Sequence, residues 1–341
     1  MAKINYILSM LFGLQLFAGE LNTNVTTDSG LSVENKTFYD RTLLESAKPN
    51  LIHNQFGQKR PIPKNGGKKI EFRRYNALPK ALTPLTEGVT PDGKKLAVTA
   101  IEAEAKQYGD YVALSDVLDL TAIDNNVLEA TKAIGNQAGL TLDTVTRNFL
   151  QAGTNVMYCP KVADGVETAV TSRADLDATC KLTVDVVKKV VATLKANNIK
   201  KIGGSYVAII HPYVSYDIMS DPRWEDMQKY TNADNMYEGE IGRIAGVRFV
   251  ETSEALVVKT STNPAVFCSL FFGENAYGVT EVSGGGLRTI IKQLGSAGTA
   301  DPLDQRSTVG WKAMQTAEIL DQTAMIRVES CGEFSGTAKA N

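Results

Sequence analysis

The chain has 341 residues, of which 43% are hydrophobic and 22% are charged, a composition typical of a soluble globular protein with a large buried core. Its net charge of -2 argues against a dedicated nucleic-acid-binding protein, because such proteins are usually clearly basic. The four cysteines and two histidines show no C-x-x-C pair and no zinc-ligand spacing, so we predict reduced thiols and neither a metal nor a cofactor.

Residues 1–57 are predicted to form an N-terminal arm. An apolar run from Ile4 to Phe17 is similar to a secretory signal peptide, which leaves export, and with it disulfide formation, open. Polar residues interrupt this run, so it is too broken to span a membrane. The polar stretch from Leu21 to Lys36 is typical of an extended arm. The helical pattern that follows places three apolar residues on one side: Leu43, Leu44 and Ala47.

Residues 58–116 are predicted to form a long two-stranded hairpin and its base. Apolar and polar residues alternate from Ile70 to Arg73 and again from Leu96 to Ile101, which is the period of a β-strand. Prolines and glycines between these arms predict the tip of the hairpin. A two-stranded arm buries too little apolar surface to be stable alone in water, so we expect it to lie on another surface.

The first arm and the residues before it are strongly basic, with Glu71 as the one acidic residue among them. Such a run is either a solvated face or a surface that docks on an acidic patch of another copy of the chain. The predicted inter-subunit contacts on this hairpin are Lys68, Lys69, Arg73, Arg74, Tyr75 and Glu87.

A long amphipathic helix is predicted from Val127 to Gln151. Apolar residues recur along it at steps of three or four, which gives the helix one buried face. Asp124, Asn125 and Asn126 are candidates for its N-cap, and Gly153 follows its end as a C-terminal glycine. The pattern alone is fully compatible with an ordinary core helix.

The rest of the chain predicts an α/β block and closing strands. After a connection from Met157 to Lys181, we predict a helix from Thr183 to Asn198 and a buried strand from Tyr206 to Ile210. Gly239 to Glu251 predicts a glycine-rich strand pair. Later strands are predicted at Ala265 to Phe272, Tyr277 to Val282, Leu287 to Leu294 and Trp311 to Val328, with a return to the first sheet and a loose tail after Ser330. This order of elements favours one α+β body.

No catalytic constellation is predicted, so we expect a structural protein and not an enzyme. Neither histidine lies in a motif that would support a Ser-His-Asp or Cys-His set. The sequence holds no phosphate-binding glycine loop. Acidic pairs such as Asp217 with Asp221, or Asp301 with Asp304, are interpreted as loop acids, and a carboxylate hydrolase stays as an alternative.

Four linked phrases stand out in the first half of the chain: Ile62-Pro63-Lys64, Phe72-Arg73-Arg74-Tyr75, the run from Thr83 to Pro91, and Gln107-Tyr108-Gly109-Asp110-Tyr111. Together they resemble the major capsid proteins of tailed bacteriophages, in the N-four-type branch with the Hong Kong 97 (HK97-like) shell fold. The resemblance is dense from His53 to Thr154 and returns more weakly from Gly239 to Thr252.

This resemblance implies a division of the chain into an N-terminal arm (1–57), an extended hairpin or E-loop with its base (58–116), a spine helix and peripheral domain (117–181), an axial domain (182–300), and closing peripheral strands with a tail (301–341). It implies a major capsid protein that self-assembles as hexamers and pentamers into an icosahedral head around double-stranded DNA, in a virion assembled in the host cytoplasm.

The implied partners are further copies of the chain together with scaffold, portal and decoration proteins, without a membrane and without sequence-specific DNA contacts. An encapsulin-like bacterial compartment and an exported binding protein are the alternatives.

Overall fold

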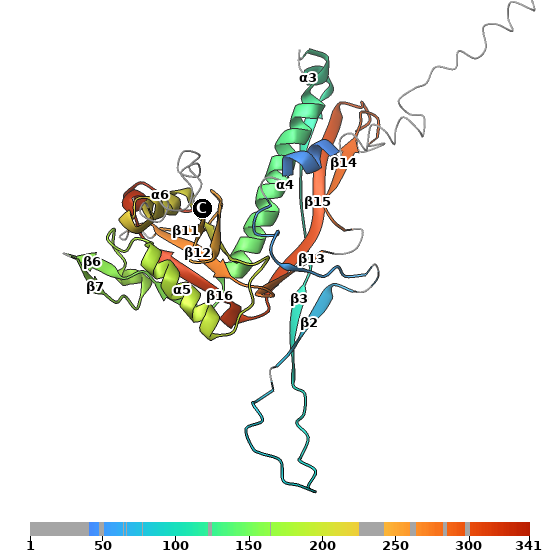
Figure 1. Ribbon diagram of the computed structural model, residues 1–341. Coiled ribbons are helices and arrows are strands. Elements are labelled where there is room, and N and C mark those ends of the chain that lie inside the picture. Colours follow the sequence, from blue (N-terminus) through green and yellow to red (C-terminus); the bar gives the residue numbers. More distant parts are fainter. Residues whose placement is uncertain are drawn as a thin grey trace, which may run out of the picture.

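A computed structural model describes residues 41–47, 51–63, 65, 67–76, 78–121, 125–163, 165–224, 242–259, 264–281, 285–296 and 301–341. Within them, two sheets form the body and a two-stranded hairpin projects from it (Figure 1). This mixture of helices and strands confirms the predicted α+β class. The predicted N-terminal arm lies mostly outside the described residues, as does the N-cap candidate Asp124. None of the described helices is both long and apolar enough to cross a membrane.

The first sheet has five strands and is built around one long central strand, β15. Its register with β4 is antiparallel over the whole length of β4, and β13 and β14 pair with the opposite side of β15. The bounds are β1 Gln58–Lys59, β4 Lys106–Ser115, β13 Tyr277–Glu281, β14 Arg288–Lys292 and β15 Arg306–Ile319.

Helix α4, Asn126–Gln151, lies along this sheet and confirms the predicted long helix (Figure 1). The Asn125 side chain accepts a hydrogen bond from the Leu128 N–H and thus caps the helix. The apolar face of α4 packs against β15, and a short helix over residues 41–47 covers the same cluster. The buried residues of this cluster are Leu43, Ile134, Ala138, Leu142, Val309, Trp311 and Ala313.

The second sheet has seven strands and carries helices α5, Val184–Ala196, and α6, Pro212–Met219. Its central strands are buried on both faces, so they read as continuous apolar runs. The predicted helix at 183–198 and strand at 206–210 are therefore confirmed. The strands are β5 Val156–Tyr158, β8 Tyr206–Ile210, β9 Arg243–Ile244, β10 Val247–Glu251, β11 Val257–Val258, β12 Val266–Phe272 and β16 Met325–Ser330.

The segment predicted as one closing strand, Trp311 to Val328, is two strands in two different sheets. β15 returns to the first sheet, as expected, and the chain then crosses to the second sheet, where β16 pairs with β12. The crossover turns at Asp321, whose side chain accepts a hydrogen bond from the Thr323 N–H. The membership of the two sheets therefore does not follow the predicted domain boundary at residue 300. Strands β13 and β14, before this boundary, lie in the first sheet, and β16, after it, lies in the second.

The prediction of a loose tail after Ser330 is wrong. Cys331, Ser335 and Ala338 are buried, and Phe334 stacks on Tyr213 of α6 with ring centroids 4.5 Å apart. Few apolar residues mark this segment in the sequence, so its packing against the second sheet could not be read from periodicity.

Candidate functional site

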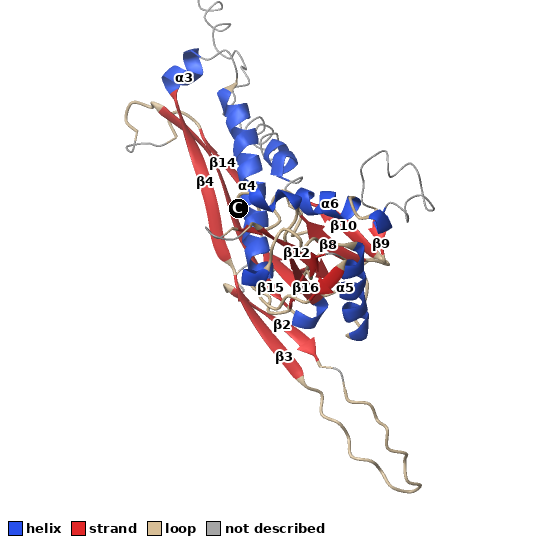
Figure 2. Cartoon of the chain, turned by 90° about the vertical axis from the view of Figure 1, so that its left-hand side faces the viewer, coloured by secondary structure: helices blue, strands red, loops and turns tan. Residues whose placement is uncertain are grey.

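The hairpin formed by β2, Lys69–Tyr75, and β3, Val98–Glu104, projects away from both sheets (Figure 2). Between these strands, all the described residues from 78 to 97 are exposed. This segment carries large apolar side chains with exposed fractions of 54% to 82%: Leu78, Leu82, Leu85, Val89 and Leu96. Such a ribbon leaves apolar surface in water that another molecule can cover.

The root of the hairpin is anchored by one aromatic side chain. Phe72 is 2% exposed and packs with Ala103 and Leu320 in a small separate cluster. Its ring lies directly against Gly278 of β13, where an added Cβ would come within 2.7 Å of the ring. The glycine therefore makes room for the anchor, and the hairpin leaves the body at a defined point.

An ion pair clamps the same root to the crossover between the sheets. Arg74 Nη1 lies 2.8 Å from Asp321 Oδ1 and also donates to the Leu320 carbonyl oxygen at 3.4 Å. Partial burial tends to raise the pKa of Asp321, but hydrogen bonds from Thr323 and the charge of Arg74 outweigh burial and lower this pKa. A cavity of about 370 Å³ beside the clamp is lined both by residues of the hairpin root and by residues of the body.

The structure gives three of the six predicted contact residues, Lys69, Arg73 and Arg74, ion-pair partners within the chain. Lys69 pairs with Glu102 at 3.2 Å, and Arg73 pairs with Glu71 at 2.9 Å, which raises the pKa of Arg73. Lys68, Tyr75 and Glu87 are exposed. Arg73 and Arg74 keep much of their side chains exposed despite these ion pairs, and the inter-subunit contacts of the whole set stay a prediction. The apolar tip is the feature that the sequence reasoning missed, although its leucines recur within the predicted turn.

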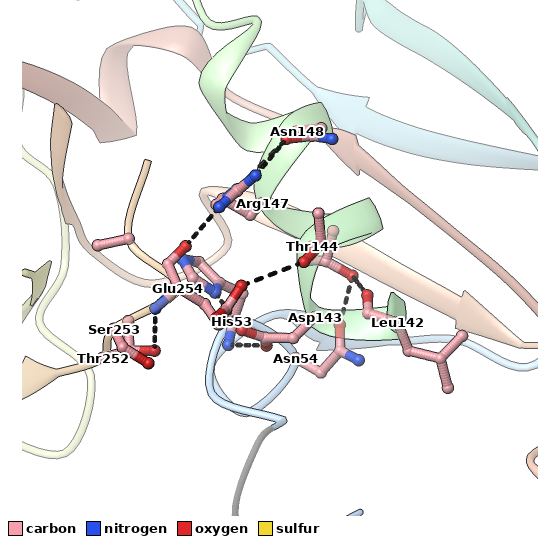
Figure 3. Close-up of polar contacts among 12 residues, drawn as sticks. His53, Asn54, Leu142, Asp143, Thr144, Arg147, Asn148, Thr252, Ser253 and Glu254 are labelled. Atoms are coloured by element: carbon pink, nitrogen blue, oxygen red, sulfur yellow. Dashed lines mark hydrogen bonds and ion pairs between the residues drawn. The ribbon is translucent and has the colours of Figure 1, made fainter. Parts of the chain in front are cut away.

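A buried polar network fixes the segment before the hairpin to the C-terminal half of α4 (Figure 3). Asp143 and His53 are both fully buried. The Asp143 carboxylate accepts the His53 backbone N–H at 2.7 Å and lies 2.7 Å from the ring Nδ1. Tyr277 of β13 donates its hydroxyl to the His53 carbonyl oxygen at 2.5 Å, and burial raises the pKa of Tyr277. His53 is therefore a structural histidine.

The same network reaches both sheets. Gln315 of β15 donates to Thr146 Oγ1 at 2.7 Å and to Asn54 Oδ1 at 3.1 Å. The next residue of α4, Arg147, donates to the carbonyl oxygen of Glu254 at 2.8 Å, in the loop after β10 (Figure 3). Helix α4 thus joins the hairpin base and the two sheets through hydrogen bonds.

The remaining reactive groups have structural partners. The His211 ring accepts the Tyr213 N–H at the start of α6, and Asp221 accepts the Val184 N–H at the start of α5. Asp301 lies beside Arg306. The four cysteines are free and buried, and burial raises the pKa of the Cys331 thiol to about 12. Among the described residues no group of acidic, histidine and cysteine side chains is arranged to hold a metal ion.

Three solved structures are similar to this chain. The Cyanophage Pam1 capsid is 11% identical, with 86% of this chain and 93% of that chain covered and a TM-score of 0.65. The capsid of Cyanophage P-SCSP1u is 14% identical, with coverages of 83% and 89% and a TM-score of 0.63. The capsid of Ralstonia phage GP4 is 14% identical, with coverages of 83% and 88% and a TM-score of 0.62. These similarities show that the fold is HK97-like.

Comparison with curated protein sequences finds no match. The family model described as phage capsid protein matches residues 89–284, from the hairpin tip to three residues beyond β13. This match includes the spine helix α4 and most of the second sheet. Because it covers more than half of the chain, the protein belongs to the phage capsid protein family.

Proposed function

We propose that this major capsid protein builds the phage head by laying the hairpin of each copy across the adjacent copy. The observation that carries the proposal is the exposed apolar tip between residues 78 and 97, which finds no cover within the described chain. Head-to-tail contacts of this kind close into rings when the rotation between copies closes. In the proposed head these rings are hexamers and pentamers.

The proposed head is icosahedral and encloses double-stranded DNA without reading its sequence, in keeping with the near-neutral charge of the chain. In this arrangement the second sheet faces the ring axis, and the first sheet and α4 lie at the periphery. Assembly takes place in the host cytoplasm, with scaffold, portal and decoration proteins as further partners. The phage capsid family is a structural one, which implies a non-enzymatic role.

Reversal of both arginines at the hairpin root, Arg73→Glu with Arg74→Glu, is expected to prevent shell formation while the subunit stays folded. The change removes the positive surface offered to a neighbour and places a carboxylate beside Glu71 and another beside Asp321. Negative-stain electron microscopy of the expressed protein measures the shells, and circular dichroism checks the fold.

Two controls separate the internal clamp from the contact with a neighbour. Asp321→Asn removes the clamp but keeps both arginines, and shells are expected to form. Lys188→Glu with Lys195→Glu makes the same change in charge on the exposed surface of α5 and should also leave shells intact. Normal shells from the double arginine variant would contradict the contact. Nucleic acid in purified particles distinguishes a phage head from an encapsulin-like compartment.

A further inference from the structure

The strand β4 is an edge strand with one open side. Its ten residues pair with β15 on one side, and Figure 2 shows it along the outer margin of the first sheet. On its other side no backbone hydrogen bond to another described residue is formed between positions 106 and 115. An edge of this length without a proline is a template for pairing with another chain.

The register identifies which backbone groups face the open side. The Asp116 N–H donates to the Gln305 carbonyl oxygen at 3.1 Å, which continues the β4–β15 ladder. Because hydrogen-bonded positions alternate in an antiparallel pair, the even-numbered residues of β4 bond to β15. The odd-numbered residues therefore direct their N–H and C=O groups outward: Gln107, Gly109, Tyr111, Ala113 and Ser115.

Both ends of the open stretch are defined by the chain itself. The Ala105 N–H already donates to the Lys68 carbonyl oxygen at 2.8 Å, so the hairpin occupies the edge up to that point. Helix α3, Asp116–Thr121, takes the backbone out of the strand at the other end. The midpoint of the stretch that remains is Tyr111, whose side chain is 69% exposed.

We propose that β4 pairs antiparallel with β4 of a second copy about a two-fold axis that passes through Tyr111. In this register Lys106 of each copy lies opposite Asp116 of the other, which places opposite charges across the contact twice. Asp110 lies opposite Val112, so no like charges face each other directly. The two Tyr111 side chains form an aromatic cross-strand pair at the axis.

The free subunit covers the centre of this edge with its own side chain. Asp110 Oδ1 accepts the Tyr111 N–H at 2.8 Å, and Asp110 Oδ2 accepts from Gln137 of α4 at 2.6 Å. Pairing transfers the Tyr111 N–H from this carboxylate to the second copy. A charged residue at the middle of an open edge is a device that limits indiscriminate pairing.

This contact goes beyond the proposed hairpin contact and uses different residues. Hairpins laid head to tail close rings, but a shell also needs a contact that joins one ring to the next. A two-fold contact is self-complementary, so the same strand serves both rings. The β4 edge lies on the first sheet, on the far side of β15 from β13 and β14.

Cysteine cross-linking of the full chain tests the register. Two copies of Tyr111→Cys would place their Cα atoms about 5.5 Å apart, within disulfide range. Two copies of Gln107→Cys, the matched exposed control on the same edge, would lie roughly 26 Å apart. The native cysteines are all buried and do not compete. After mild oxidation we expect Tyr111→Cys to form a disulfide-linked dimer and Gln107→Cys to form none. Absence of the dimer from Tyr111→Cys, or equal amounts of dimer from both variants, would overturn the proposal.

A proline substitution tests the hydrogen bonds. Ala113→Pro removes an outward N–H but leaves the ladder with β15 intact, and proline is tolerated at such edge positions. We expect a folded subunit whose shell yield falls by about tenfold, because each contact loses two hydrogen bonds, while Ala113→Ser assembles normally. Normal shells from Ala113→Pro would overturn the proposal.

A charge exchange and a deletion separate this contact from others. Lys106→Asp is expected to weaken assembly, and Lys106→Asp with Asp116→Lys to restore it; failure of the rescue would contradict the register. In a chain lacking residues 80–94, Tyr111→Cys is still expected to form dimers, so this contact stands even where the hairpin contact fails. Loss of dimers there would show that the edge receives the hairpin of a neighbour instead.

Discussion

Deletion of residues 80–94, with the shortened hairpin closed by an Asn-Gly turn, is expected to abolish shells completely and leave soluble subunits. The deleted segment is exposed throughout and belongs to none of the hydrophobic clusters of the described chain. Its removal therefore takes away contact surface for a neighbour but no internal packing. Sedimentation velocity measures the size of the product, and thermal unfolding by circular dichroism is expected to show a midpoint close to that of the subunit with an intact hairpin.

The apolar character of the tip can be tested without shortening it. Leu82→Ser with Leu85→Ser removes two of its most exposed large side chains and should lower shell yield strongly. Thr83→Ser with Thr86→Ser changes the same segment but keeps the leucines, so it should assemble normally. Full-sized particles from the deletion would show that the hairpin is a solvated extension and would remove the main support for the proposed contact.

Elements with strong periodicity were predictable from the sequence. Helix α4 follows from apolar steps of three or four and an asparagine cap, and the observed start at Asn126 is one residue from the predicted one. The buried strands β8 and β12 were predictable because central strands are apolar without alternation. The crossover between β15 and β16 was not, since both strands are similarly apolar and the sequence does not state which sheet each will join.

The contacts that fix the hairpin were beyond reach because they join residues far apart in the chain. The His53 N–H meets Asp143 across 90 positions, and Arg74 meets the Leu320 carbonyl across 246. A single sequence shows each residue but not its partner. Charge was the visible signal on the hairpin, so the arginines were singled out and the tip leucines were assigned to a turn. The open edge of β4 was also beyond reach, because only the pairing of β4 with β15 in the folded chain shows which side of the strand is left without a partner.

Replacement of Asp143 by alanine is expected to lower the free energy of unfolding by about 3–5 kcal/mol, because each buried polar group left without a partner costs about 1–3 kcal/mol. The change leaves the His53 N–H without its acceptor and the ring Nδ1 without its partner, in a site closed to solvent. Since the ring Nε2 already has no partner among the described residues, the imidazole would then be unpaired on both nitrogens.

Urea unfolding of the subunit that lacks residues 80–94 measures this loss without the contribution of a shell. Asp143→Asn is the matched control: its amide oxygen can accept the His53 N–H and its amide nitrogen can donate to Nδ1, so the loss should be about 1–2 kcal/mol. Hydrogen exchange should rise in residues 51–57 of Asp143→Ala, because this segment is held to α4 through the same carboxylate. An alanine variant as stable as the asparagine variant would show that packing around the hairpin base, and not this hydrogen-bonded pair, fixes the segment to the spine helix.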